Sequence, residues 1–317
     1  MRTLGLLLLY FVPGTRVLDM SASVSTESVA NQIGDAAIGP NFILGTNYAA
    51  SPAGALHVYG LDGKVRQTID GLDRPHGVDL KGNLAVVAER GRSQLRFFRI
   101  DSSSGRLAEA GAIPVFEGQP GEAAIPASVA LYRRKSDGAL FAIVSRRAAG
   151  ANGAHLWQYR LMDDGARVTG AKVREFGKNS GKTASEINNV AADDADGYIY
   201  YSEQSCCLHK YHADPDHQGA AVEVARHATD KFQGARRGIT IAPSWLIAAD
   251  RIDGKSEYHV YAKRGAAIRP LFILRGAADA TDGIEFAPAL PGFPDGVLLA
   301  TNSAGRNLLL FPLRSRY

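Results

Sequence analysis

The 317-residue sequence contains only two cysteines, and they are adjacent, Cys206 and Cys207. Adjacent cysteines cannot link distant strands and lack the spacing of a metal knuckle, so we interpret them as two inert thiols. The sequence also has no concentrated run of positive charge. The net charge is only +4 and the basic residues are scattered, which argues against a nucleic-acid or anionic-lipid partner.

Several catalytic motifs are absent as well. The eight histidines form no HxH or HExxH arrangement, and neither a GxSxG elbow nor a Walker loop occurs. These absences argue against zinc, serine-hydrolase and nucleoside-triphosphatase chemistry. The piece DDADG is too short for a calcium loop. Helical periodicity is absent throughout, so an all-β fold is expected.

An apolar run lies near the start, within residues 1–14, and is too short to span a bilayer as a helix. One arginine precedes it, as in a signal peptide. We therefore expect residues 1–23 to be a signal peptide or a disordered N-terminus, and residues 24–317 to form one folded domain. A signal peptide would give a secreted or periplasmic protein.

Two series of repeats are present, each with six copies. The first series is a strand pair in which an apolar second strand ends on a polar residue; its copies occupy 39–47, 77–89, 128–145, 189–203, 238–250 and 283–302, the first being incomplete. The second is an alternating strand with a central aromatic residue, at Tyr59, Phe98, Tyr159, Tyr211, Tyr261 and Phe311. Six such units at a nearly constant spacing predict a six-bladed β-propeller. A β-sandwich would not be expected to repeat one strand pair six times.

Antiparallel neighbours bring the start of each inner strand and the end of the second strand to the same end of the blade. The pattern therefore predicts a ring of polar side chains at one mouth of the propeller, with six arginines among them: Arg90, Arg146, Arg147, Arg236, Arg237 and Arg251. Guanidinium groups bind phosphate oxygens in bidentate fashion, so a polyanionic ligand is expected. Each arginine taken alone is more often solvated or paired with a carboxylate such as Glu89 or Asp250.

Five segments resemble those of the β-propeller phytases, in the same order and at similar intervals: 46–64, 97–107, 172–177, 190–203 and 280–286. The resemblance extends over nearly the whole chain from about residue 24. It implies a calcium-dependent phosphatase that acts on phytate or a similar phosphorylated small molecule, with no nucleic-acid or membrane partner, and a monomer.

The resemblance also implies roles for individual residues. Arg90 falls at a phosphate-binding arginine, and Arg146 or Arg147 falls where the family has a lysine; we add Arg237 as a phosphate ligand. Glu203 and Asp282 are the expected catalytic residues, and the expected calcium ligands are Glu203, Asp279 and Asp282.

Several positions depart from the family pattern. The acidic motif that usually follows GDAA is missing, and Tyr48, Asn188, Ala235 and Arg237 stand where a lysine or carboxylates are usual. Fewer anionic oxygens should weaken a calcium cluster. Two alternatives to a phytase therefore stay open. One is a propeller that binds an anion without hydrolysing it. The other is a lactonase-type hydrolase with a metal held by residues such as Glu89, Asn188, Asp250 and Asn302.

Overall fold

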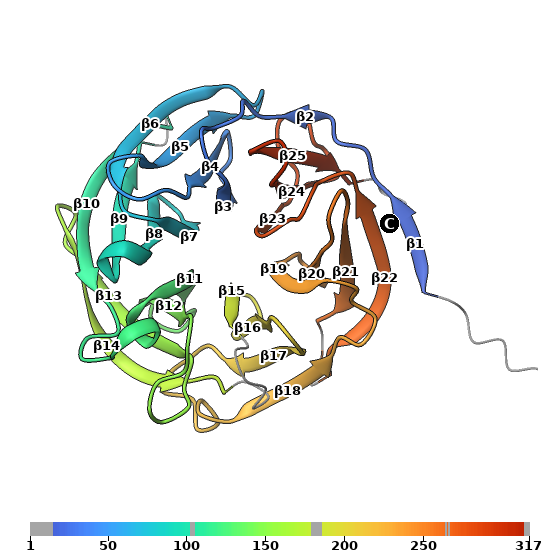
Figure 1. Ribbon diagram of the computed structural model, residues 1–317. Coiled ribbons are helices and arrows are strands. Elements are labelled where there is room, and N and C mark those ends of the chain that lie inside the picture. Colours follow the sequence, from blue (N-terminus) through green and yellow to red (C-terminus); the bar gives the residue numbers. More distant parts are fainter. Residues whose placement is uncertain (1–14, 102–104, 179–185, 264, 266, 314–317) are drawn as a thin grey trace, which may run out of the picture.

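The computed structural model describes residues 15–101, 105–178, 186–263, 265 and 267–313. Six sheets, antiparallel except for one outer strand, are arranged in a ring around a central axis (Figure 1). The predicted six-bladed β-propeller is therefore confirmed. Within the described residues, no helix is long and apolar enough to cross a membrane.

Five of the sheets have four strands and the sheet of blade 5 has five; the innermost strand of each blade comes first along the chain, except that the chain start supplies the outermost strands of blades 5 and 6. Blades 1–3 consist of β3 (Ile33–Ile38), β4 (Phe42–Asn47), β5 (Gly54–Gly60), β6 (Val65–Leu72); β7 (Pro75–Lys81), β8 (Leu84–Glu89), β9 (Gln94–Ile100), β10 (Leu107–Pro114); and β11 (Pro126–Arg133), β12 (Leu140–Arg146), β13 (Leu156–Asp163), β14 (Val168–Phe176). Blades 4–6 consist of β15 (Ile187–Asp193), β16 (Tyr198–Glu203), β17 (Cys207–His212), β18 (Glu223–Ala228); β19 (Ala235–Ile241), β20 (Trp245–Arg251), β21 (Ser256–Ala262), β22 (Arg269–Gly276); and β23 (Ile284–Ala287), β24 (Val297–Asn302), β25 (Asn307–Pro312), β2 (Val24–Ser25). Two short 3-10 helices, η1 (Arg90–Arg92) and η2 (Gly121–Ala124), lie in loops of blades 2 and 3.

The two repeat series correspond to particular strands. All six central aromatic residues lie on the third strand of their blade, and all are buried: Tyr59, Phe98, Tyr159, Tyr211, Tyr261 and Phe311. The apolar clusters combine residues of neighbouring blades; one joins Phe97 of blade 2 to Trp157 of blade 3. The core is thus a set of layers between blades, because each sheet has apolar side chains on both faces.

Glycine allows the inner strands to approach one another. A Cβ atom at Gly77 would lie 2.6 Å from the Cα of Ser128 in the next blade, and one at Gly238 would lie 2.8 Å from the nitrogen of Ile284. Larger residues at these two positions would push the blades apart. The close approach leaves a narrow central channel lined by the six inner strands.

Both ends of the described chain contribute to blade 6. Strand β2 pairs with β25, and β1 (Arg16–Asp19) pairs in parallel with β22 as a fifth strand of blade 5 (Figure 1). Between them, Met20 is buried and its backbone nitrogen donates to the carbonyl of Arg275. Residues 16–23 thus supply hydrogen bonds to the outer edges of two blades. The signal-peptide prediction falls mostly on residues 1–14, outside the described residues.

Candidate functional site: an arginine-lined mouth

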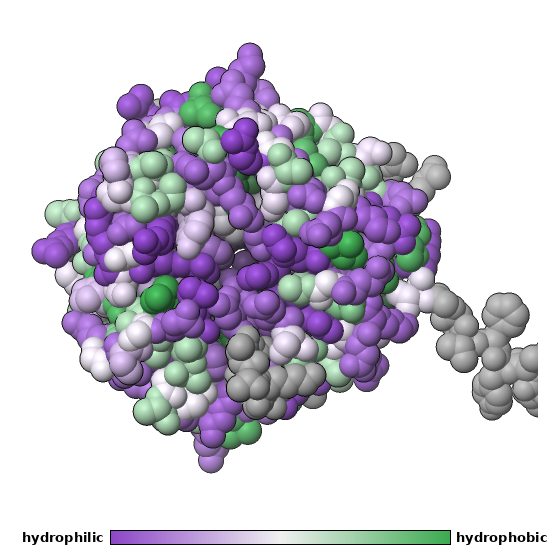
Figure 2. All heavy atoms as spheres, in the orientation of Figure 1, coloured by the Kyte–Doolittle hydropathy of each residue, from purple (hydrophilic) through white to green (hydrophobic). Residues whose placement is uncertain are grey.

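A cavity of about 410 Å³ opens at the end of the channel where the inner strands begin. In the view down the propeller axis, hydrophilic side chains surround a central hollow (Figure 2). The lining residues come from all blades or the loops next to them: Gln32, Gly34, Tyr48, His76, Arg90, Arg147, Glu186, Gln204, Arg237, Arg251 and Asp282. Four guanidinium groups thus face two carboxylates, and the cavity carries a net positive charge.

Arg90 begins η1, directly after strand β8, and its guanidinium lies over the ring of Tyr48, 5.5 Å from the ring centre. Among the described residues, the buried Nε and Nη2 of Arg90 find no hydrogen-bond partner. His76 lies in the same cavity, and burial together with the charges of Arg90 and Arg237 holds its pKa well below the usual value. His76 is therefore neutral, and the unused donors of Arg90 suit an anionic ligand.

Asp282 is the centre of a second group in the mouth. Its Oδ1 lies 3.1 Å from Nε of Arg251 and 3.5 Å from Nε of Arg237, and its Oδ2 accepts a hydrogen bond of 2.6 Å from Gln32. Burial raises the pKa of Asp282, while the two arginines act in the opposite direction. The carboxylate holds two guanidinium groups at one side of the cavity.

Arg147 forms the other arginine–carboxylate pair of the mouth, with Glu186. Its Nη2 lies 2.9 Å from Oε1 of Glu186, and its Nε donates to the same oxygen. The pair is about one-third exposed on the arginine side, so Arg147 can turn toward a ligand without leaving a fully buried carboxylate behind.

Of the predicted site residues, Arg90, Arg147, Arg237 and Asp282 lie together in the mouth, whereas Arg146, Glu203 and Asp279 do not line it. Arg146 is fully buried and donates to the carbonyl of Ala154. Glu203 is also fully buried, with a carboxylate oxygen 3.1 Å from His209. Asp279 accepts hydrogen bonds from the backbone nitrogens of Gly254 and Ala304 and so joins two loops. Each of these side chains is held by partners of its own outside the cavity.

The Phytase family matches residues 26–300. This chain belongs to that family. A 3-phytase of Bacillus subtilis (strain 168) is 28% identical over 280 residues, which cover 80% of this chain and 68% of the relative. A solved structure of a proposed 6-phosphogluconolactonase from Bacteroides uniformis has a TM-score of 0.58 at 14% identity, covering 92% of this chain and 84% of that one, a likeness of fold.

The mouth of this phytase-family chain fits a calcium cluster poorly. Calcium prefers six to eight oxygen ligands with several carboxylates among them. Among the residues lining the mouth, only Glu186 and Asp282 carry carboxylates, and both are paired with arginines. The predicted ligands Glu203, Asp279 and Asp282 lie in three different environments. The mouth therefore offers too few free anionic oxygens for a calcium cluster.

The repeats explain why some strand-end residues line the mouth and others do not. In four blades, a side chain at or next to the end of the second strand accepts hydrogen bonds from backbone nitrogens that lie before the inner strand of the same blade. These residues are Asn47 at the end of β4, Glu89 at the end of β8, Asn302 at the end of β24 and Asp250, the next to last residue of β20. Three of the four residues suggested for a lactonase metal are thus engaged in loop contacts. The next residue along the chain lines the cavity in three of these blades, as Tyr48, Arg90 and Arg251, and the residue after the second strand lines it in blades 3 and 4, as Arg147 and Gln204.

Some residues that line the mouth do not belong to the strand-end pattern on which the sequence prediction rests. Gln32 and Gly34 lie at the start of blade 1, where the repeat copy is incomplete, and Glu186 precedes β15. For Glu186 the sequence offers one analogy between blades. Glu186 lies two residues before Asn188, just as Arg74 lies two residues before His76 at the start of blade 2. That analogy is too weak to select a carboxylate.

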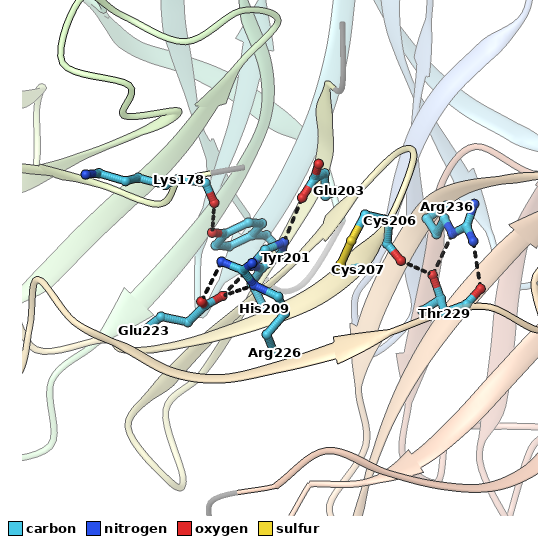
Figure 3. Close-up of a disulfide and its surroundings, with 10 residues drawn as sticks. All are labelled: Lys178, Tyr201, Glu203, Cys206, Cys207, His209, Glu223, Arg226, Thr229 and Arg236. Carbon is cyan, nitrogen blue, oxygen red and sulfur yellow. Dashed lines mark hydrogen bonds and ion pairs between the residues drawn. A yellow bond between two sulfur atoms is a disulfide. The ribbon is translucent and has the colours of Figure 1, made fainter. Parts of the chain in front are cut away.

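The interpretation of the cysteines as two inert thiols is wrong. Cys206 and Cys207 form a disulfide in the turn between β16 and β17 (Figure 3). Cys206 is half-buried, and Cys207 is 2% exposed. The carbonyl of Cys206 accepts hydrogen bonds from Thr229, which in turn accepts from Arg236. The turn is therefore fixed to blade 5 through a chain of hydrogen bonds.

Proposed function

We propose that this chain recognises phosphorylated small molecules of the phytate class in the arginine-lined mouth and releases phosphate from them. The observation that carries the recognition is the set of four guanidinium groups around one cavity, with buried donors of Arg90 that have no partner among the described residues. Phosphate oxygens are strong acceptors for such forked donors. Membership of the Phytase family supports phosphate release as the reaction.

The lining residues suggest a division of roles. Arg90 and Arg147 lie on one part of the rim and bind separate phosphates, while Asp282 keeps Arg237 and Arg251 oriented toward the ligand. His76 is neutral and lies beside Arg90, so it donates or accepts one hydrogen bond without adding charge.

A second candidate is binding without hydrolysis. It is favoured by the engagement of both mouth carboxylates with arginines, which leaves few anionic oxygens for a catalytic metal.

Export from the cytoplasm, expected from the N-terminal segment, fits an extracellular phosphate-scavenging role and remains part of the proposal.

The test combines calorimetry with phytate and measurement of phosphate release, each with calcium and with a chelator. Arg90→Gln should weaken phytate binding by roughly 10-fold to 100-fold, since it removes a charge-assisted contact. Arg66→Gln is the matched control, because Arg66 lies on outer strand β6 and pairs with Asp62.

Calcium-dependent release that is lost in Asp282→Asn supports hydrolysis. Tight binding with no release under either condition supports the second candidate. Failure of the wild-type protein to bind phytate, or equal effects of Arg90→Gln and Arg66→Gln, would overturn recognition at the mouth.

A further inference from the structure

A buried group of side chains with metal-binding atoms lies beside the disulfide in blade 4 (Figure 3). A carboxylate oxygen of Glu203, Sγ of Cys207 and a ring nitrogen of His209 all lie within 4.8 Å of one another. Glu203 and His209 are fully buried, and Cys207 is 2% exposed. Carboxylate, thiolate and imidazole together are ligands that Zn²⁺ and similar borderline metals prefer, whereas calcium and magnesium prefer oxygen alone.

The orientation of His209 is already fixed by its neighbours. Its Nε2 lies 3.1 Å from the carboxylate of Glu203, and its Nδ1 contacts Glu223 on the opposite side. Glu223 is held by Arg226 at 2.8 Å, and the ring of Tyr201 stacks on the imidazole with centres 4.4 Å apart. A carboxylate on Nδ1 is the usual outer-sphere partner of a metal-binding histidine, because it directs Nε2 to the metal.

The disulfide prevents this group from acting as a site, since Sγ of Cys207 is bonded to Cys206 and cannot become a thiolate. We propose that reduction of the Cys206–Cys207 disulfide creates a buried site for one divalent transition-metal ion of the Zn²⁺ class, with Glu203, Cys207 and His209 as ligands. The fourth position is left to water.

The reduction requires an external dithiol. One of its thiolates attacks Sγ of Cys206, the more exposed of the two sulfurs, and the electron pair of the broken S–S bond passes to Sγ of Cys207. The second thiol of the reductant then displaces Cys206 from the mixed disulfide, and the reductant leaves as its own disulfide. The metal replaces the thiol proton of Cys207 and any proton on Nε2 of His209.

Blade 5 offers a natural comparison. Asp250, Glu257 and His259 occupy the corresponding strands and also lie within 4.8 Å of one another, with a glutamate where blade 4 has Cys207. This group contains no sulfur. A spectroscopic probe of metal–thiolate bonding therefore reports blade 4 alone.

The test uses Co²⁺, whose charge-transfer absorption with thiolate distinguishes sulfur ligation from binding elsewhere. The protein is reduced with a dithiol, separated from it under argon and titrated with Co²⁺. We expect one equivalent of Co²⁺ to give the thiolate band in the reduced protein and none in the oxidised protein, and Zn²⁺ to displace it. Cys206→Ser leaves Cys207 as a free thiol, so this variant should give the band without reductant.

Cys207→Ser and His209→Gln should lose the band or weaken Co²⁺ affinity at least tenfold, whereas His259→Gln should leave both unchanged. A band that persists in Cys207→Ser, or that depends on His259, would overturn the proposal. So would absence of the band in Cys206→Ser, a variant that keeps all three proposed ligands and changes only a half-buried residue.

Discussion

Arg146 and Arg147 are adjacent in the chain, yet their side chains lie in different environments. Arg146 packs near Phe116 and Trp157, with its guanidinium carbon 5.2 and 5.5 Å from the two ring centres, and its donors are used by Ala154 and Gln119. Arg147 lines the mouth. Both were equally good phosphate-binding candidates in the sequence, because strand-end position alone does not say which way a side chain turns.

We predict that alanine substitution separates the two arginines. Arg146→Ala should lower the free energy of unfolding by about 2–4 kcal/mol, since it removes the buried hydrogen bonds that Arg146 donates to the carbonyls of Ala154 and Ala123 and two cation–π contacts. Arg147→Ala should change stability little but weaken phytate binding several-fold. Urea denaturation and calorimetry measure the two effects; the reverse assignment would contradict the site described above.

Asp35 lies on the inner strand of blade 1 and faces a second cavity of about 200 Å³ along the channel. Burial raises the pKa of Asp35 to about 8, with a further contribution from Asp79, although the backbone nitrogens of Ala36 and Val78 donate to it. Burial likewise raises the pKa of Asp79 and of Glu285. Lys81 and Asn189 are also in this cavity.

The raised pKa of Asp35 predicts a loss of stability as the pH rises. Between about pH 4 and pH 8 the folded chain keeps a proton on Asp35 that the unfolded chain has released, so this group favours folding most at the acidic end. The slope for one proton is at most about 1.4 kcal/mol per pH unit. Urea unfolding of Asp35→Asn at pH 5, 7 and 9 should show a smaller decline than the wild type. An equal decline would mean that Asp35 is ionised in the folded state.

At the scale of strands, the six repeats made the propeller predictable. The alternating pattern of side chains around Tyr59 or Phe311 indicates a β-strand, and both residues are buried. Six copies at a similar spacing are compatible with few architectures other than a propeller. The closure by β2 was not predictable in the same way, because Val24–Ser25 is only two residues long and has no periodicity of its own. Nor could the repeats show that Glu203 turns toward His209, since that depends on a contact between two strands.

We predict that β2 is needed to close the ring while β1 is not. β2 and the residues beside it give β25 several hydrogen bonds, among them those of Ser23 and Thr26 with Leu310 and Leu308. Deleting residues 1–27 should therefore lower the free energy of unfolding by about 3–5 kcal/mol and leave an exposed sheet edge that promotes aggregation.

The matched control is deletion of residues 1–19, which removes β1 from a blade that already has four strands but keeps Met20. This deletion should cost clearly less. Urea denaturation and light scattering compare the two truncations; equal losses would show that closure does not depend on β2.

Across the whole molecule, charge is separated along the channel. The mouth cavity has four arginines and two carboxylates, whereas the second cavity is lined by Asp35, Asp79, Asp193, Asp194, Glu285 and a single lysine. The same inner strands line both, with their first residues at the mouth and later residues at the second cavity. A polyanion is therefore attracted to the mouth, whereas the second cavity offers it a single lysine that is already paired with Asp194.

This separation predicts a strong dependence of phytate binding on salt. The ligand carries many charges and meets several guanidinium groups at once, so raising the ionic strength from about 50 to 500 mM should weaken binding roughly tenfold or more. Arg251→Gln should reduce both the affinity and the steepness of the salt dependence, because it removes one mouth charge, while Arg66→Gln on the outer surface should alter neither. Calorimetry across a salt series tests this directly. Binding that is tight yet indifferent to salt would place the ligand outside the arginine mouth, since four guanidinium groups around a polyanion must contribute an attraction that salt screens.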